Sequence, residues 1–179
     1  TLEELVEFAP PELKDKPLWK ATASHNGSTA RNAFDLKPET RYDTKTSMKP
    51  GMWFQIEFPT ITKVASIILN SERSRNDFPR GYEVKVSEDG KKWSEVLAKG
   101  RGQHPATTIE LPRVPGRFLR ITQTGRAGRW YWSIHELQVF GIAKKFIPEM
   151  KAPGGESEAE DEEDIENLEE LLEEAEKLE

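Results

Sequence analysis

The chain of 179 residues contains no cysteine. This absence excludes a disulfide framework and metal sites built from thiolates, although it leaves the cellular compartment open. The sequence also has no run of about 18 apolar residues, so no helix is expected to span a membrane. Because the chain opens with Thr-Leu-Glu rather than with a signal peptide, we expect it to be part of a longer protein.

Motifs of the common enzyme classes are missing as well. We find no GxSxG, no phosphate-binding loop and no HExxH. Carboxylates outside the C-terminal segment are spread over strands and turns, with no pair marked for acid–base work. The three histidines, His25, His104 and His135, are isolated from one another and are expected to be structural. The sequence therefore predicts a protein that is not an enzyme.

Charge is distributed unevenly along the chain. The net charge is −6, but residues 151–179 hold 14 acidic side chains and only two lysines. The first 150 residues are therefore basic, with 24 Lys and Arg against 18 Asp and Glu. A basic body can attract anionic partners, although a charge of this size is also compatible with plain solubility.

Residues 17–145 show the pattern of an all-β domain. Glycine, proline, asparagine and aspartate separate stretches with apolar residues at alternate positions, as strands require. The run at 64–69 is almost continuously apolar, which predicts a strand buried on both faces. No long amphipathic helix is expected in this region. The predicted strands are 53–58, 64–69, 82–87, 107–111, 118–123 and 136–140, and they favour a β-sandwich.

The flanking regions have a different character. Residues 1–16 are expected to form a linker or a short lead-in helix. The stretch APGGESEAEDEED at 152–164 has no apolar anchor and should be disordered, so residues 146–164 are predicted to form a disordered acidic linker. Residues 165–179 place apolar side chains at helical spacing and predict an acidic amphipathic helix. A solvated tail, a docking helix, self-pairing and the start of a further domain all remain open.

The order of motifs resembles a known family. TASHN, NAFDLKPETRY, GMWFQIEF, PRGYEVKVSEDGKKW, GRFLRIT and YWSIHELQVFG follow one another over roughly residues 18–142. Together they resemble the discoidin domain, also called the coagulation-factor C-type domain, and especially the bacterial family 32 carbohydrate-binding modules. The resemblance implies an eight-stranded jelly-roll β-sandwich like that of galactose-binding domains. It also implies an accessory domain of a large secreted or envelope enzyme of planctomycete-like bacteria.

In this family the ligand contacts loops at one end of the sandwich. The resemblance places Arg73, Arg75, Asn76 and Asp77 in one of these loops, as a polar clamp for sugar hydroxyls. Arginine offers a planar fork of donors, and asparagine offers both a donor and an acceptor. The histidine that often contacts sugar in the family has no counterpart here, because its position is Asp43. Asp43 can still bond a hydroxyl, but galactose-type recognition is not implied.

Aromatic and cationic side chains follow in a later loop. We expect Trp130 to be exposed for packing against a sugar ring, while Tyr131 or Trp132 anchors the loop in the core. Cations near a tryptophan favour an anionic ligand, such as a uronate or a sulfated glycan, and the alternative is a solvated basic surface. No nucleic-acid motif is present, so no nucleic-acid partner is expected. The cations expected at this end are Arg73, Arg75, Arg80, Arg126 and Arg129.

The segment NAFDLKPET resembles the family loop that binds a structural calcium ion. The resemblance implies side-chain oxygens from Asp35, Thr40 and Glu136, and hard oxygen ligands suit Ca²⁺. Two positions depart from the family pattern, because Leu36 and Lys37 replace a glycine and an Asp or Asn. The alternative is a loop held by an Asp-capped turn without metal. Main-chain carbonyls would come from Asn32, Lys37 and His135.

These observations predict a non-catalytic carbohydrate-binding module outside the cytoplasm that targets a larger enzyme in the same chain to a polysaccharide. The alternative is a protein–protein interaction or adhesion domain on the same fold. Membrane insertion of the clotting-factor kind needs protruding apolar loop residues. Only Met48 and Met52 are candidates, so no membrane insertion is expected.

Overall fold

The computed structural model describes residues 9–144. The acidic linker and the C-terminal helix expected from the sequence lie outside the described residues, as do the first eight residues of the expected lead-in segment. Residues 9–15 contain no helix. Glu12 forms an isolated antiparallel bridge with Phe140, and a 3-10 helix, η1, follows at Lys16–Leu18.

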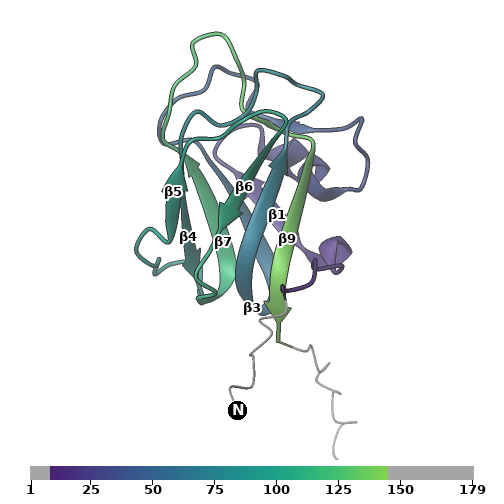
Figure 1. Ribbon diagram of the computed structural model, residues 1–179, viewed down its shortest axis with the longest axis vertical. Helices are drawn as coiled ribbons and strands as arrows, with labels where there is room; N and C mark the ends of the chain where they lie inside the picture. The colour runs from purple at the N-terminus through teal and green to yellow at the C-terminus, as the bar shows by residue number, and fades with distance from the viewer. Residues whose placement is uncertain (1–8, 145–179) are drawn as a thin grey trace, which may run out of the picture. The chain divides into compact units, whose positions relative to one another are not determined.

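Antiparallel strands are the main secondary structure of the described chain (Figure 1). This architecture confirms the predicted jelly-roll β-sandwich. Another 3-10 helix, η2 (Gly27–Phe34), lies beside β1 and was not predicted from the sequence. The strands of the described residues are β1 (Lys20–Ala23), β2 (Tyr42–Asp43), β3 (Trp53–Asn70), β4 (Tyr82–Ser87), β5 (Ala98–Gly100), β6 (Ala106–Glu110), β7 (Pro115–Gln123), β8 (Ser133–Ile134) and β9 (Glu136–Ala143).

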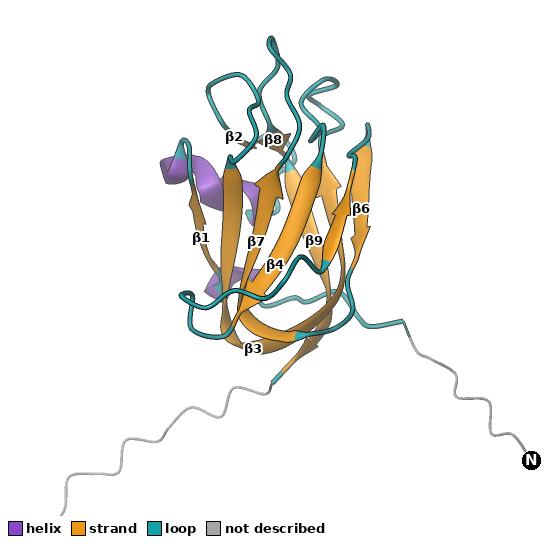
Figure 2. Ribbon diagram, turned by 90° about the vertical axis from the view of Figure 1, so that its left-hand side faces the viewer, coloured by secondary structure: helices purple, strands orange, loops and turns teal. Residues whose placement is uncertain are grey.

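Strand β3 is shared by both layers of the sandwich. Its first part pairs with β1 and β7, and its second part pairs with β6 and β9. The pairing with β7 shifts register between Glu57 and Thr62, where the strand curves from one layer to the other (Figure 2). The sequence predicted two strands at 53–58 and 64–69, and this division was wrong because the chain continues as one strand through Pro59.

The predicted burial of residues 64–69 on both faces was also only partly correct. Val64, Ile67 and Leu69 are buried, whereas Ser66 and Ile68 on the opposite face are only half-buried. The inward side chains of the two layers form one core with Trp19, Tyr42 and Trp132. Among the described residues, no helix is long and apolar enough to cross a membrane.

Loops gather at one end of the sandwich, at the top of Figure 1. Strands β2 and β8 form a small two-stranded sheet there, with Asp43 opposite Ser133 (Figure 2). Trp132 is fully buried beside this sheet and packs edge-on against Tyr42, with ring centroids 6.3 Å apart. This buried pair fixes the base from which the loops at 71–81 and 124–132 extend.

Candidate functional site

A cleft of about 410 Å³ opens between the loops at this end of the sandwich. It brings together six of the eight ligand-binding residues predicted from the sequence: Arg73, Arg75, Asn76, Asp77, Arg129 and Trp130. Asp43 and Arg126 do not line it, whereas Arg41, Ser74 and Tyr131 do and were not predicted. The structure therefore places most of the predicted clamp around one cavity, and their contact with a ligand stays a prediction.

The loop at 71–80 is shaped by its own hydrogen bonds. Ser74 N–H donates to Ser71 O, and Asp77 N–H donates to Ser74 O, each at 2.8 Å. The Arg80 guanidinium donates to Phe78 O at 2.7 Å and to Asn76 O at 2.8 Å, and lies 3.8 Å from the centre of the Phe78 ring. Desolvation lowers the pKa of Arg80, and nearby Asp77 opposes this shift. Arg80 therefore holds the loop together instead of facing the cleft.

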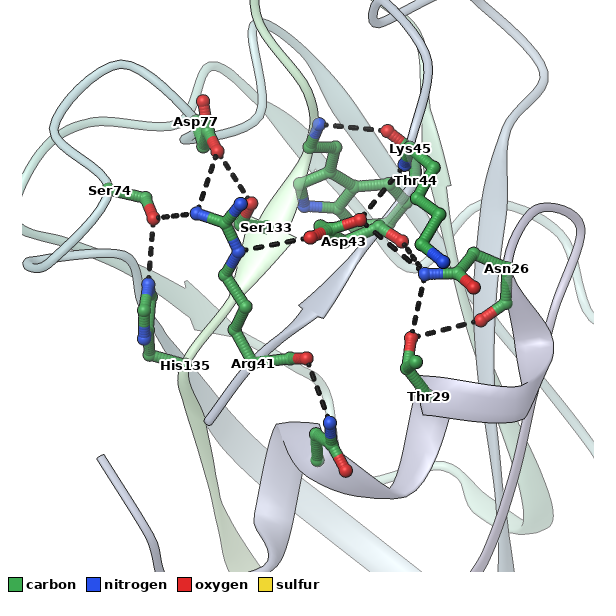
Figure 3. A network of polar contacts seen from close by, with 12 residues as sticks. Asn26, Thr29, Arg41, Asp43, Thr44, Lys45, Ser74, Asp77, Ser133 and His135 are labelled. Carbon is green, nitrogen blue, oxygen red and sulfur yellow. Dashed lines mark hydrogen bonds and ion pairs between the residues drawn. The ribbon is translucent and has the colours of Figure 1, made fainter. Parts of the chain in front are cut away.

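Arg41, which lines the cleft, is the centre of a polar network (Figure 3). Its Nε donates to Asp43 Oδ2 at 3.0 Å, and its Nη1 donates to Ser74 Oγ at 2.5 Å. The same Nη1 lies 3.7 Å from Asp77 Oδ2. Buried Asp77 also accepts a hydrogen bond from Ser133 Oγ at 2.6 Å. Arg41 thus joins the loop at 71–80 to the sheet formed by β2 and β8.

Asp43 belongs to this framework. Its Oδ2 faces Arg41, and its Oδ1 accepts the Lys45 N–H at 3.0 Å. Asn26 Nδ2 donates to the Asp43 main-chain oxygen at 2.8 Å. The geometry therefore gives Asp43 a role in orienting Arg41, and any effect on a ligand would pass through that guanidinium.

His135 connects the cleft to the neighbouring loop at 35–40. Its Nδ1 lies 3.1 Å from Pro38 O, and its Nε2 lies 2.8 Å from Ser74 Oγ. A carbonyl can only accept, so Nδ1 carries a proton, and in the neutral ring Nε2 accepts from the Ser74 hydroxyl. The predicted structural role of His135 agrees with this arrangement. His25 and His104 also have hydrogen-bond partners in Ser24 and in the Glu72 carbonyl.

Three arginines around the cleft are not neutralised by the protein. The side chains of Arg73, Arg75 and Arg129 are exposed, and they form no hydrogen bond or ion pair with the described residues. Trp130 and Tyr131, which are 43% and 39% exposed, lie beside them, while Trp132 is buried as predicted. Cations and aromatic faces are thus both available to a ligand.

The predicted calcium loop is held by hydrogen bonds. Thr40 Oγ1 lies 2.9 Å and 2.7 Å from the two Asp35 carboxylate oxygens, and Lys37 N–H donates to Asp35 Oδ1 at 3.0 Å. Asn32 contributes an amide donor to Arg41 O. On the opposite side, Glu136 Oε1 accepts the Leu36 N–H at 2.7 Å, while Oε2 faces the Lys16 ammonium at 3.2 Å.

This arrangement does not fit calcium closed by Glu136. Ca²⁺ needs six to eight oxygen ligands, but the carboxylate expected from β9 is already covered by an N–H group and an ammonium. Among residues 9–144, no group of three or more His, Asp or Glu side chains is placed to hold a metal ion. Glu136 as arranged here does not fit as a calcium ligand. The calcium prediction, including main-chain ligation by Asn32, Lys37 and His135, stays untested.

The family assignment follows from comparison with known proteins. The F5/8 type C domain model matches residues 19–137. The chain belongs to the F5/8 type C domain family. The discoidin resemblance seen in the motifs is therefore confirmed. Comparison with curated proteins gives no match.

Solved structures share the fold of this F5/8 type C domain. The family 32 module of NanJ from Clostridium perfringens, in complex with galactose, is 22% identical with a TM-score of 0.60, covering 70% of this chain and 95% of that one. CpGH89CBM32-5 from the same organism, in complex with GalNAc-β-1,3-galactose, is 22% identical with a TM-score of 0.61, covering 73% and 99%. The C-terminal domain of a chitobiase from Bacteroides fragilis is 23% identical with a TM-score of 0.62, covering 75% and 100%.

Neither of the two methionines near the loop end of this F5/8 type C domain is exposed. Met48 and Met52, the only residues that the sequence suggested for membrane insertion, are buried. Met48 forms an isolated bridge with Ala127 and so joins two of the loops. Both methionines therefore serve the core of the loop end.

The sequence contained a signal for one of the missed cleft residues of this F5/8 type C domain. Arg41 and Asp43 are two positions apart, so in a strand their side chains point to the same side and can pair. No comparable signal marks Ser74 or Tyr131. Their place at the cleft depends on how the two loops meet.

Proposed function

We propose that this domain is a non-catalytic glycan-binding module, that its ligand site is the cleft between the loops at 71–80 and 124–132, and that an anionic glycan is preferred. The observation that carries this proposal is the set of three exposed arginines, Arg73, Arg75 and Arg129, which no described residue neutralises. In its cellular setting the domain would hold a larger secreted or envelope enzyme on a polysaccharide.

The physical argument rests on charge and shape. A carboxylate or sulfate ester can accept paired hydrogen bonds from a guanidinium, and charge-assisted bonds are stronger than bonds between neutral groups. The exposed faces of Trp130 and Tyr131 offer an apolar surface for sugar C–H groups. The cleft is open to solvent, so the affinity of a single module should be modest.

Arg41 also contributes positive charge to the cleft. Asp43 and Asp77 orient and partly neutralise its guanidinium. The outer three arginines have no such compensation, so the net field in the cleft is positive. The described residues as a whole carry 23 basic and 14 acidic side chains.

The test is affinity electrophoresis against neutral and acidic polysaccharides. Polygalacturonate or a sulfated galactan should retard the full chain, and a neutral galactan should retard it less. Retardation should weaken as salt rises, because exposed charges are screened. The double variant Arg73→Gln/Arg75→Gln should lose most of the effect. The matched control is Arg126→Gln, which removes an exposed arginine outside the cleft and should change little.

Protein binding on the same surface is the second candidate. Arginine and tryptophan are also the residues that dominate protein interfaces. If no polysaccharide of either charge retards the domain while a protein from the source lysate is captured by it, and the capture is lost in Arg73→Gln/Arg75→Gln, the glycan proposal is wrong.

A further inference from the structure

Lys16 is a buried lysine beside the predicted calcium loop. Its residue exposure is 4%, which is rare for a lysine unless a carboxylate accompanies it. Lys16 Nζ lies 3.2 Å from Glu136 Oε2 and 3.5 Å from Glu12 Oε1. The ammonium therefore sits between two carboxylates, one of which is the predicted metal ligand from β9.

The segment that carries Lys16 is fixed to the sandwich on both sides. Leu13 N–H donates to Val139 O at 2.8 Å, so the segment runs along β9. Arg31 of η2 donates to Pro17 O at 2.9 Å and to Trp19 O at 2.8 Å. The match to the family model begins at residue 19, so Lys16 is supplied by a part of the chain that precedes the matched region.

Glu136 links Lys16 to the loop at 35–40. Its Oε1 accepts the Leu36 N–H, and Leu36 has a φ of 64°, a left-handed conformation that leucine rarely adopts. A carboxylate at this point holds the loop backbone in place. Pro38 O of the same loop then contacts His135, which contacts Ser74 at the cleft. The charge at Glu136 is thus connected to the ligand-binding end.

A metal ion on the same carboxylate would conflict with Lys16. A calcium ion bound to Glu136 Oε2 would lie roughly 6 Å or less from the ammonium, given calcium–oxygen distances of about 2.3–2.6 Å. Two cations at such a distance in a half-buried site repel strongly. Occupation by calcium would require Lys16 to move out of a position that the packed segment defines.

We propose that the Lys16 ammonium supplies at Glu136 the positive charge for which the family uses calcium, so that the loop at 35–40 and the adjoining cleft are assembled without a metal. The chain then carries its own cation, covalently attached. This inference does not depend on which ligand the cleft binds.

Thermal unfolding of the full chain in EDTA and in millimolar CaCl₂ tests the proposal. The wild-type midpoint should be the same in both to within about 1 °C, since no ligand binding to the folded state is involved. Lys16→Met keeps a stem of similar length and removes the ammonium group. Its midpoint in EDTA should fall by roughly 5 °C or more, because Glu136 is left without a cation. CaCl₂ should recover part of this loss.

Two controls separate charge at Glu136 from charge in general. Lys14→Met removes an exposed lysine that pairs with the same Glu12, at 2.6 Å. Its melting midpoint should equal that of the wild type in EDTA and should not change when CaCl₂ is added. In the double variant Lys16→Met/Glu136→Gln, the unpaired carboxylate is gone. This protein should melt higher in EDTA than Lys16→Met alone and should not respond to calcium.

The proposal is overturned if EDTA lowers the wild-type midpoint or calcium raises it. It is equally overturned if Lys16→Met melts like the wild type in EDTA. Should Lys16→Met fail to fold in EDTA, refolding in CaCl₂ supports the proposal, and the wild-type comparison still decides it. Glycan binding has no part in these readouts, so they can fail independently of the proposed function.

Discussion

Two sets of arginines meet at the loop end of the sandwich, and they differ in their partners. Arg41 and Arg80 are held by carboxylates, a hydroxyl or main-chain carbonyls. Arg73, Arg75 and Arg129 have no partner among the described residues. The first set therefore contributes to the shape of the loops, and the second set is available to something outside the protein.

The difference shows why counting cations in a sequence is a poor guide to a binding site. All of these arginines lie in neighbouring loops and have the same formal charge. A guanidinium that is hydrogen-bonded within the protein stabilises the fold, but its donors are already used. A guanidinium without a partner in the protein adds little to stability and keeps its donors for a ligand. Substitutions in the two sets should accordingly change different properties.

A loss of both stability and glycan binding is expected from Arg41→Met. This change leaves Asp43 and buried Asp77 without their shared cation and Ser74 without a donor, which should cost about 2 kcal/mol of unfolding free energy. Acidic-glycan binding should fall by more than tenfold, because the loop at 71–80 loses its anchor. Urea unfolding and binding isotherms would measure the two losses. If the unfolding free energy is unchanged, Arg41 does not belong with the arginines that stabilise the loops.

A purely functional effect is expected from Arg73→Gln/Arg75→Gln. Because neither side chain has a partner among the described residues, the unfolding free energy should stay within about 0.5 kcal/mol of wild type. The dissociation constant for an acidic glycan should rise about tenfold or more, equivalent to about 1.4 kcal/mol. Calorimetry in low salt gives the affinity. A loss of stability comparable to that of Arg41→Met would remove the distinction between the sets.

The neighbouring tryptophans give the same contrast for aromatic side chains. Trp130→Ala should weaken glycan binding by about five- to tenfold, with little change in stability, since the ring is 43% exposed. Trp132→Ala should instead destabilise the fold by about 3–5 kcal/mol, because the ring is fully buried. Circular dichroism melts distinguish the two. Equal melting losses in both variants would contradict the assignment of Trp130 to the ligand surface.

The smallest effect is expected at Asp89, whose carboxylate accepts main-chain hydrogen bonds from the turn that follows β4. The N–H groups of Lys92 and Lys91 lower the pKa of Asp89 from 3.8 to about 2. A depressed pKa stabilises the fold above the unfolded value near 3.8 and loses this contribution as pH falls toward 2. Asp89→Asn should thus melt about 1–2 °C below wild type at pH 7. The gap should close between pH 4 and pH 2, and a gap that stays constant with pH would refute the assignment.

The sequence predicted the elements that repeat a simple pattern. Val84 and Val86 alternate with polar residues, and β4 has the predicted bounds of 82–87. The 3-10 helix η2 was missed although its buried residues, Ala30, Ala33 and Phe34, have helical spacing, because the segment GSTARNAF is short and carries few apolar side chains. Its Phe34 ring packs 5.4 Å from the ring of Trp19. The short strands β2 and β8 were missed because two-residue strands depend on tertiary contacts rather than on local sequence.

The candidate site divides in the same way. Arg73, Asn76 and Trp130, which the family resemblance placed at one end of the sandwich, line one cleft because the loops at that end converge. Their contact with a ligand is still a prediction. The resemblance did not separate Arg80 from its neighbours, because only coordinates reveal the carbonyls that its guanidinium holds. The pairing of Lys16 with Glu136 could not be predicted, because the two residues lie 120 positions apart in the chain and meet only in the folded domain.

The pairing of Glu12 with Phe140 and of Gly141 N–H with Pro11 O, at 3.0 Å, brings the entry and exit of the described chain side by side. Both ends of the described chain lie at the end of the sandwich opposite the loops (Figure 1). The domain therefore has both of its chain connections on one side and its proposed ligand-binding loops on the other. A domain with adjacent ends can be inserted into a surface loop of a host domain as well as joined between two neighbours. The cleft lies at the end of the sandwich away from both connections.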